Sequence, residues 1–164
     1  MMGMTPPPEH EAVVKRVIHT TADFDYARNL HFTPRAVEQA VKALHAGAVI
    51  VTDTNMALAG AAMKKAAQEH PGAILAVGNA PTALLTIAEQ IESGLRPALV
   101  IGVPVGFVNV VESKERLFAV CEKHDVPAIV AMGRKGGSNV AAAICNALIY
   151  SAAEMLDPSA RGWK

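Results

Sequence analysis

Short apolar runs alternate with longer amphipathic segments along most of this chain. Four runs are continuously apolar, which is typical of strands buried in a parallel sheet; they span residues 48–51, 73–77, 98–101 and 128–131. Around and between them, apolar positions recur at helical spacing over residues 34–46, 57–69, 81–93, 112–124 and 139–155. This regular alternation predicts a three-layer α/β/α fold with a mainly parallel, Rossmann-like sheet.

Single residues place several helix boundaries. Thr33 as N-cap, with Pro34 at the first helical position, predicts a helix start. Asn79 is placed to cap the helix that follows it, although the N–H groups there could instead hold a ligand carboxylate. Before the first apolar run, residues 9–15 favour a short helix that leads into an extended, partly buried segment, Arg16–Asp23.

Length and composition limit the possible functions. A chain of 164 residues, 51% hydrophobic and only 4% aromatic, is long enough for one domain with a real core. We expect that domain over residues 11–156, with a flexible leader at 1–10 and a loose tail at 157–164. The formal net charge is zero. Without a basic field to neutralise phosphates, nucleic acid is not expected as the main partner.

Membrane insertion and secretion are not expected either. The longest apolar stretch, residues 98–111, is interrupted by two glycines and a proline and is too short to cross a bilayer. The first eight residues lack the apolar core of a secretory signal. Cys121 and Cys145 lie in apolar helical patterns, which indicates buried free thiols in a reducing compartment. We therefore expect a cytoplasmic protein.

The predicted topology gathers four strand-end loops at one edge of the sheet. In parallel α/β sheets, ligands bind beyond the carboxyl ends of the strands. The loops there are Asp53–Asn55, Gly78–Asn79, Gly102–Gly106 and Gly133–Ser138, the most polar or glycine-rich loops in the chain. We expect the ligand pocket among them, with Asp53 either binding the ligand or only bracing its loop.

Two of these loops suggest what the pocket holds. Residues 133–138 (GRKGGS) combine glycines and a helix start with the cations Arg134 and Lys135, so an anionic carboxylate or phosphate is the natural guest. An exposed tight turn is the alternative. Residues 102–107 (GVPVGF) are apolar and stiff, which suggests either a wall for a flat apolar ligand or a plain bend. Neither loop has the spacing of a Walker A or dinucleotide-binding motif.

One histidine is placed for proton transfer. His19 follows an apolar run and precedes Thr20, Thr21 and Asp23. Histidine can give or take a proton near neutral pH, so this position suits an acid–base residue at the mouth of a pocket. A hydrogen-bonded structural histidine is the alternative. No carboxylate or cysteine lies at metal-ligand spacing with His19 and the nearby His31, so no metal site is expected.

Six segments of the chain carry motifs in a recognisable order. They are Arg16–Asp23 (RVIHTTAD), Asp53–Gly60 (DTNMALAG), Gly78–Leu85 (GNAPTALL), Arg96–Val108 (RPALVIGVPVGFV), Glu112–Lys114 (ESK) and Gly133–Ser138 (GRKGGS). Together they resemble the precorrin-8X methylmutase (precorrin isomerase) family of cobalamin biosynthesis. The similarity covers most of residues 11–150, in the order that the family has.

The resemblance implies that a methyl group moves from C-11 to C-12 in ring C of a corrinoid macrocycle. The product would be hydrogenobyrinate, or cobyrinate from cobalt-precorrin-8, with no added cofactor and with a homodimer that holds the ligand near its interface. The catalytic histidine of the family corresponds to His19, which would give a proton or hydrogen bond to the macrocycle at ring C. The residues expected to bind the substrate and its acetate and propionate arms are Arg16, Thr20, Thr21, Asp53, Thr54, Asn55, Met56, Gly78, Asn79, Ala80, Thr82, Gly102, Val103, Pro104, Val105, Gly106, Phe107, Lys135, Gly136 and Gly137.

Two departures from the family pattern accompany the resemblance. Family members usually have an additional segment before the RVIHTTAD motif, and a further strand–helix unit between the DTNMALAG and GNAPTALL motifs. That unit supplies an arginine that reaches the ligand of the neighbouring subunit, whereas this chain runs from Gly60 to Ile74 through a single predicted helix. Two alternatives therefore stay open: a non-catalytic corrinoid- or tetrapyrrole-binding protein, and an enzyme that acts on a different tetrapyrrole.

Overall fold

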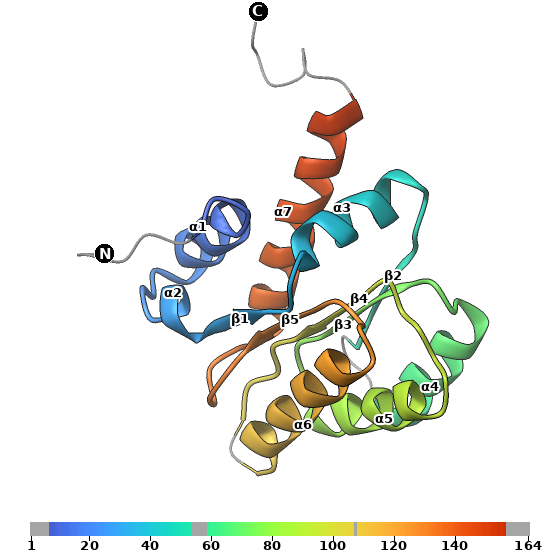
Figure 1. Cartoon of the computed structure of the whole chain (residues 1–164). Coiled ribbons are helices and arrows are strands. Elements are labelled where there is room, and N and C mark those ends of the chain that lie inside the picture. The colour runs from blue at the N-terminus through green and yellow to red at the C-terminus, as the bar shows by residue number, and fades with distance from the viewer. Residues whose placement is uncertain (1–6, 54–58, 107, 157–164) are drawn as a thin grey trace, which may run out of the picture.

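A five-stranded sheet lies between two groups of helices (Figure 1). The computed structural model describes residues 7–53, 59–106 and 108–156. In chain order its elements are α1 (Glu11–Thr21), α2 (Tyr26–Asn29), β1 (Leu30–Phe32), α3 (Ala36–His45), β2 (Ile50–Thr52), α4 (Ala59–Glu69), β3 (Ile74–Val77), α5 (Pro81–Glu92), β4 (Leu99–Gly102), α6 (Val110–Lys123), β5 (Ala128–Ala131) and α7 (Ser138–Leu156).

Four strands form the parallel part of the sheet. The strand order is β1-β5-β4-β3-β2, in which β2 to β5 are parallel and β1 pairs antiparallel with β5 at one edge. Every residue of β3, β4 and β5 is buried, as the continuous apolar runs predict for strands covered on both faces. The predicted three-layer α/β/α fold with a mainly parallel sheet is confirmed.

The two faces of the sheet carry separate apolar clusters. On one face α1, α3 and α7 bury residues such as Val17 and Ile144, and on the other face α4, α5 and α6 bury residues such as Leu84 and Leu117 (Figure 1). Each fully buried aliphatic side chain of this size stabilises the fold by about 1.5–3 kcal/mol. The C-terminal part of α7 projects away from the sheet (Figure 1). Among the described residues, no helix has both the length and the apolar character needed to cross a bilayer.

The prediction of an extended segment at Arg16–Asp23 is wrong, because most of these residues belong to α1. The helix continues to Thr21 and ends at Ala22, which adopts a left-handed conformation. Its buried residues are Val13, Val14 and Val17, three positions at helical spacing that pack in the same cluster as α7. His19 therefore lies in the last turn of a helix.

The predicted N-cap role of Thr33 is also wrong. Helix α3 begins at Ala36, and its N-cap residue is Arg35 in a left-handed conformation. The buried hydroxyl of Thr33 instead accepts a hydrogen bond from the backbone N–H of Ala128 at 2.8 Å. This contact connects the segment after β1 to the start of β5, where the hydroxyl is the acceptor for the first N–H of the strand. Helix α3 has no side-chain cap hydrogen bond.

Candidate active site

Three of the four predicted strand-end loops are packed directly against one another. The N–H of Gly137 donates to the carbonyl of Val103 at 2.8 Å, and the N–H of Gly106 donates to the carbonyl of Arg134 at 3.4 Å. A Cβ atom added to Gly78 would lie 2.9 Å from the carbonyl oxygen of Gly137. The loops after β3, β4 and β5 therefore meet at one edge of the sheet, as the topology predicts.

Gly136 is the tightest point of this packing. A Cβ atom at that position would lie 2.1 Å from the carbonyl oxygen of Val103 and 2.9 Å from that of Pro104. Both distances are far inside van der Waals contact with backbone atoms, so only glycine fits. The backbone of the loop after β5 is thus packed directly against the backbone of the loop after β4.

Asp53 connects the fourth strand end to the same edge. Its carboxylate, only 1% exposed, accepts hydrogen bonds from the N–H groups of Gly78 at 2.8 Å, Asn79 at 3.1 Å and Ala80 at 2.8 Å. An anion at these N–H groups also matches the positive end of the dipole of α5, which begins at Pro81. Asp53 therefore braces the loop, which was one of its two expected roles.

The predicted cap role of Asn79 is wrong for the same reason. The N-cap residue of α5 is Ala80, which makes no side-chain cap bond, and the side chain of Asn79 donates to the backbone carbonyl of Asp53 at 3.3 Å. The alternative expectation, that the loop N–H groups hold a ligand carboxylate, fails as well, because the carboxylate of Asp53 already occupies them.

Lys114 is a buried cation beneath the loop after β5, and sequence reasoning assigned it no role. Its Nζ donates to the carbonyl oxygens of Gly133 at 2.8 Å and Lys135 at 2.9 Å, and the residue is 0% exposed. Burial lowers the pKa of this ammonium to about 8. A signal was present in the sequence: Lys114 lies between Val110 and Leu117 on the buried stripe of α6, where an apolar residue is the usual choice.

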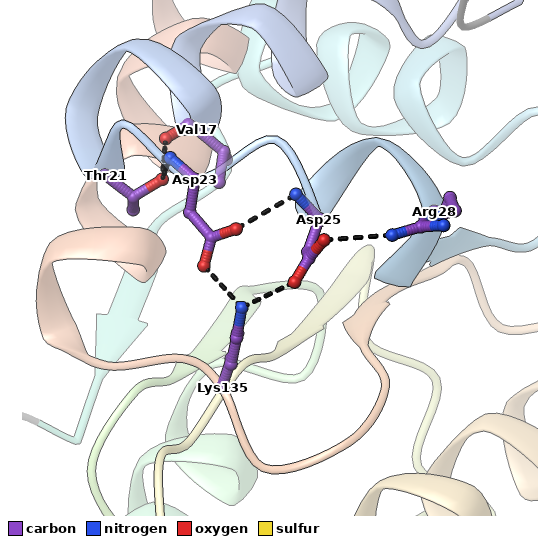
Figure 2. Close-up of polar contacts among 6 residues, drawn as sticks. All are labelled: Val17, Thr21, Asp23, Asp25, Arg28 and Lys135. Atoms are coloured by element: carbon purple, nitrogen blue, oxygen red, sulfur yellow. Dashed lines mark hydrogen bonds and ion pairs between the residues drawn. The ribbon is translucent and has the colours of Figure 1, made fainter. Parts of the chain in front are cut away.

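The side chain of Lys135 points to the segment that follows His19 (Figure 2). Its Nζ lies 2.7 Å from a carboxylate oxygen of Asp23 and 2.7 Å from one of Asp25, and Asp25 also pairs with Arg28 at 3.0 Å. The hydrogen bond from Lys135 is the main cause that lowers the pKa of both carboxyl groups, and the two carboxylates raise the pKa of Lys135. The charge of Lys135 is therefore already matched within the chain.

This exposed ion cluster predicts a pH- and salt-dependent contact. Because the pKa values of Asp23 and Asp25 are lowered in the folded state, the contact is fully present above the ordinary carboxyl pKa of about 4 and is lost as the pH falls through the lowered values. We expect Lys135→Met at pH 7 to lower the hydrogen-exchange protection of the Asp25 amide several-fold. Acidification to about pH 3 or high salt should do the same to the wild-type protein.

The control for this prediction is Lys65→Met, which removes an exposed lysine of α4. Its effect on the protection of the Asp25 amide should be nil. Equal protection in the wild type and Lys135→Met at pH 7 would show that the ion cluster does not hold this segment.

His19 lines a different hollow from the strand-end loops. The imidazole is exposed in the last turn of α1, and the hollow lies between α1 and α7 with a volume of about 440 Å³. Its lining residues are Ala12, Lys15, Arg16, His19, Ala147, Tyr150 and Ser151. The segment that follows His19 contacts the loop after β5, because Lys135 of that loop binds Asp23 and Asp25.

A second, more apolar hollow lies where α7 faces β2 and β3. It has a volume of about 280 Å³ and reaches Asp53, Gly78 and Ser138 at the loop edge. Cys145 lines it and, like Cys121, is a buried free thiol, as expected. Burial raises the pKa of Cys145 to about 11 and that of Cys121 to about 12, so neither is a thiolate nucleophile at neutral pH.

The remaining predicted site residues fall into four groups. Gly102, Val103 and Pro104 are buried inside the fold, whereas Val105 is exposed and Gly106 half-buried, so the bend predicted as the alternative describes the first part of this loop. Thr20 and Thr82 are exposed. The hydroxyl of Thr21 donates to the carbonyl of Val17 at 2.8 Å (Figure 2). Thr54, Asn55, Met56 and Phe107 lie outside the described residues.

Within the described part of the chain, no group of three or more histidine, cysteine, aspartate or glutamate side chains is arranged to hold a metal ion. The donors at the loop edge are backbone N–H groups, a lysine and hydroxyls, which suit anionic and polar organic groups. The fold thus defines a three-layer α/β/α protein with a mainly parallel sheet, and the candidate ligand site consists of loops beyond the carboxyl ends of its strands.

The chain belongs to the precorrin-8X methylmutase family, a family of isomerases. The family's model, described as precorrin-8X methylmutase, matches residues 2–61 and 59–151. The cobalt-precorrin-8 methylmutase of Salmonella typhimurium is 42% identical over 87% of this chain and 82% of its own length. That of Priestia megaterium is 38% identical over 85% of this chain and 76% of its own. The crystal structure of precorrin-8x methyl mutase from Thermus thermophilus superposes with a TM-score of 0.83 at 39% identity, covering 94% of this chain and 91% of that one.

The comparisons also locate a gap in this chain. The family match breaks at residues 59–61, at the start of α4. The alignment with the Salmonella relative runs over 179 positions although the chain has only 164 residues, so that relative has residues without a counterpart in this chain. Both observations agree with the expected lack of a strand–helix unit between the DTNMALAG and GNAPTALL motifs. These three relatives are named as methylmutases, and none supports the binding-protein alternative.

Proposed function

We propose that this protein is the methylmutase of a cobalamin pathway. It moves the ring-C methyl group of a precorrin-8 macrocycle from C-11 to C-12 and releases hydrogenobyrinate, or cobyrinate where the substrate carries cobalt. The observation that carries this proposal is the family match over residues 2–61 and 59–151, which includes every motif at the loop edge and in the His19 segment. No added cofactor is needed, because the substrate brings the migrating group with it.

His19 is the proposed acid of this reaction. Its exposed imidazole lines the hollow between α1 and α7 and can give a proton or hydrogen bond to the macrocycle at ring C. Substrate and product are isomers, so a proton that His19 gives must return to it before release. Arg16 lines the same hollow, and Thr20 is exposed beside His19, where both can meet the acetate and propionate arms.

The loop residues are proposed to hold other arms of the macrocycle. Thr82 offers an exposed hydroxyl in the first turn of α5, and the Gly136–Gly137 backbone lies at the edge where the loops meet. Lys135 can bind a substrate carboxylate only in exchange for Asp23 or Asp25. The remaining proposed contacts of the loops are Thr54, Asn55, Met56, Val105, Gly106 and Phe107. Asp53 and the N–H groups of Gly78–Ala80 bind one another, and Gly102, Val103 and Pro104 are buried, so these residues shape the site without holding an arm.

We further propose a cytoplasmic homodimer of one domain, residues 11–156, with the ligand near the interface. Ile149 and Tyr150 are exposed apolar side chains on α7, the helix that projects from the sheet (Figure 1), and Tyr150 also lines the His19 hollow. A second copy packed on this part of α7 would close the hollow around the ligand. Light scattering after gel filtration should give twice the mass of the chain.

The direct test is conversion of the substrate. Purified protein is mixed with precorrin-8X or with cobalt-precorrin-8, and the absorption spectrum is followed, with the Salmonella relative as a positive control. We expect one of the two substrates to be converted to the corresponding product. An unchanged spectrum with both, while the relative converts its own, would refute the methylmutase proposal. Binding of the macrocycle without conversion would favour the carrier alternative.

A further inference from the structure

The ammonium group of Lys114 determines how the peptide groups of the loop after β5 are turned. It binds two carbonyl oxygens of the same loop, those of Gly133 and Lys135, from the buried side. A trans peptide unit points its C=O and its N–H in opposite directions. The N–H groups of Arg134 and Gly136, which belong to the same two peptide units, therefore point away from Lys114.

One of these N–H groups is available to a ligand. Among the described residues, the N–H of Gly136 has no hydrogen-bond acceptor, although its neighbour Gly137 donates to Val103. The corresponding N–H groups at the next loop are not available, because Asp53 accepts them. Gly136 is also closely packed, since a Cβ atom added to it would lie 2.1 Å from the carbonyl oxygen of Val103.

Among the described residues, the charge of Lys114 has no partner of opposite sign. No carboxylate in the described part of the chain forms an ion pair with it, whereas Lys135 is matched by Asp23 and Asp25. A buried cation without a counter-ion acts over a longer distance than an exposed one, because little water screens it. Its field favours a negative group on the outer side of the loop.

We propose that Lys114 is a positioning residue for carboxylate binding: it turns the loop so that the Gly136 N–H faces the ligand, and it supplies the positive charge behind that N–H. This inference rests on the proposed function, because the expected ligand is a carboxylate arm of the corrinoid. Lys114 itself does not touch the ligand. Its role differs from that of Lys135, whose charge is already used to hold the segment after His19.

Three variants separate charge from shape. Lys114→Met removes both the charge and the two hydrogen bonds while keeping an unbranched side chain that fills the same space. Lys114→Gln keeps donor hydrogens without the charge. The matched control is Lys123→Met, which removes an exposed lysine from the last turn of the same helix. Thermal melts and circular dichroism report whether each variant is folded.

The measurement is the affinity for hydrogenobyrinate, followed by absorbance titration, beside KM and kcat for the substrate. We expect Lys114→Met to weaken binding and to raise KM about tenfold with kcat changed less than threefold, Lys114→Gln to lie between it and the wild type, and Lys123→Met to match the wild type. A second ligand, a corrinoid whose carboxylates are converted to amides, should show a much smaller loss in Lys114→Met. A purely structural role would weaken both ligands alike.

The outcomes keep this inference apart from the proposed function. Wild-type protein that binds hydrogenobyrinate but converts no substrate refutes the methylmutase activity, while the effect of Lys114→Met on binding still decides the role of Lys114. Unchanged affinity in a folded Lys114→Met protein, or an equal loss for the acid and the amide ligand, overturns the positioning role. Wild-type protein that binds no corrinoid at all overturns both.

Discussion

Replacing His19 with alanine is expected to lower turnover of the precorrin-8 substrate at least about 100-fold, with little change in stability. A positioned acid–base group contributes roughly 10²–10⁴ to a rate. The imidazole is exposed and lies in the last turn of α1, so its removal leaves no cavity in the core. The loss should therefore fall on kcat, while the affinity for the product hydrogenobyrinate, measured by absorbance, stays within about threefold of the wild-type value.

His45 provides a matched control. It is an exposed histidine in the last turn of α3, so His45→Ala removes the same favourable interaction with a helix dipole. His45→Ala should keep wild-type turnover. Turnover by His19→Ala within threefold of the wild type would remove His19 from the reaction.

The central strands were predictable because burial on both faces leaves a simple pattern. The apolar run at 128–131 coincides with β5, the run at 73–77 begins one residue before β3, and the run at 98–101 is offset from β4 by one residue. The edge strand β1 was missed. Its three residues, Leu30–Phe32, form a strand because Leu30 and Phe32 find partners in β5 about 100 positions later, and no local pattern records such a partner.

The His19 segment shows how a local pattern can mislead. The apolar residues Val17 and Ile18 directly before His19 suggested an extended run. The spacing of Val13, Val14 and Val17 is helical, however, and the contact between α1 and α7 decides in favour of the helix. Proton-transfer chemistry at His19 does not depend on this outcome, but the residues around the imidazole do, since they come from α1 and α7.

The site was predictable as a place but not as a set of contacts. The topology brings the glycine-rich loops together, whereas the two charged groups that hold them act on backbone atoms of distant segments. Asp53 accepts three N–H groups some 25 positions away, and Lys114 donates to two carbonyls about 20 positions away. Because nearly every residue has the same backbone N–H and C=O groups, the amino-acid sequence does not indicate which of them will be the partners. Only the presence of a charge at a buried position could have drawn attention to them.

These contacts also change where an anionic ligand can bind. Counting residue types would give Lys135 and the N–H groups of Gly78–Ala80 as the anion sites. In the structure both are satisfied within the chain, by Asp23 with Asp25 and by Asp53, respectively. Positive character at the loop edge also comes from Lys114 and from the peptide groups that it turns away from itself. A net charge of zero therefore coexists with a locally positive site.

Replacing Asp53 with alanine is expected to destabilise the fold strongly. Three N–H groups at the start of α5 then lose their acceptor at a position where the carboxylate is 1% exposed. An N–H left unsatisfied in a buried site costs about 1–3 kcal/mol, so we expect a decrease of about 3–5 kcal/mol in the free energy of unfolding. Urea titration followed by circular dichroism measures this decrease as a lower midpoint at an unchanged m-value.

Asp53→Asn tests whether the number of acceptors is the cause. One oxygen of Asp53 accepts from Gly78 and the other from both Asn79 and Ala80, so an amide can keep at most two of the three bonds by placing its oxygen toward Asn79 and Ala80. The expected loss is about 2 kcal/mol. Asp125→Asn, at an exposed left-handed position that asparagine tolerates, should stay within about 0.5 kcal/mol of the wild type. Equal losses at positions 53 and 125 would show that Asp53 does not hold the loop, and the packing of Gly78 against Gly137 would then have to position it alone.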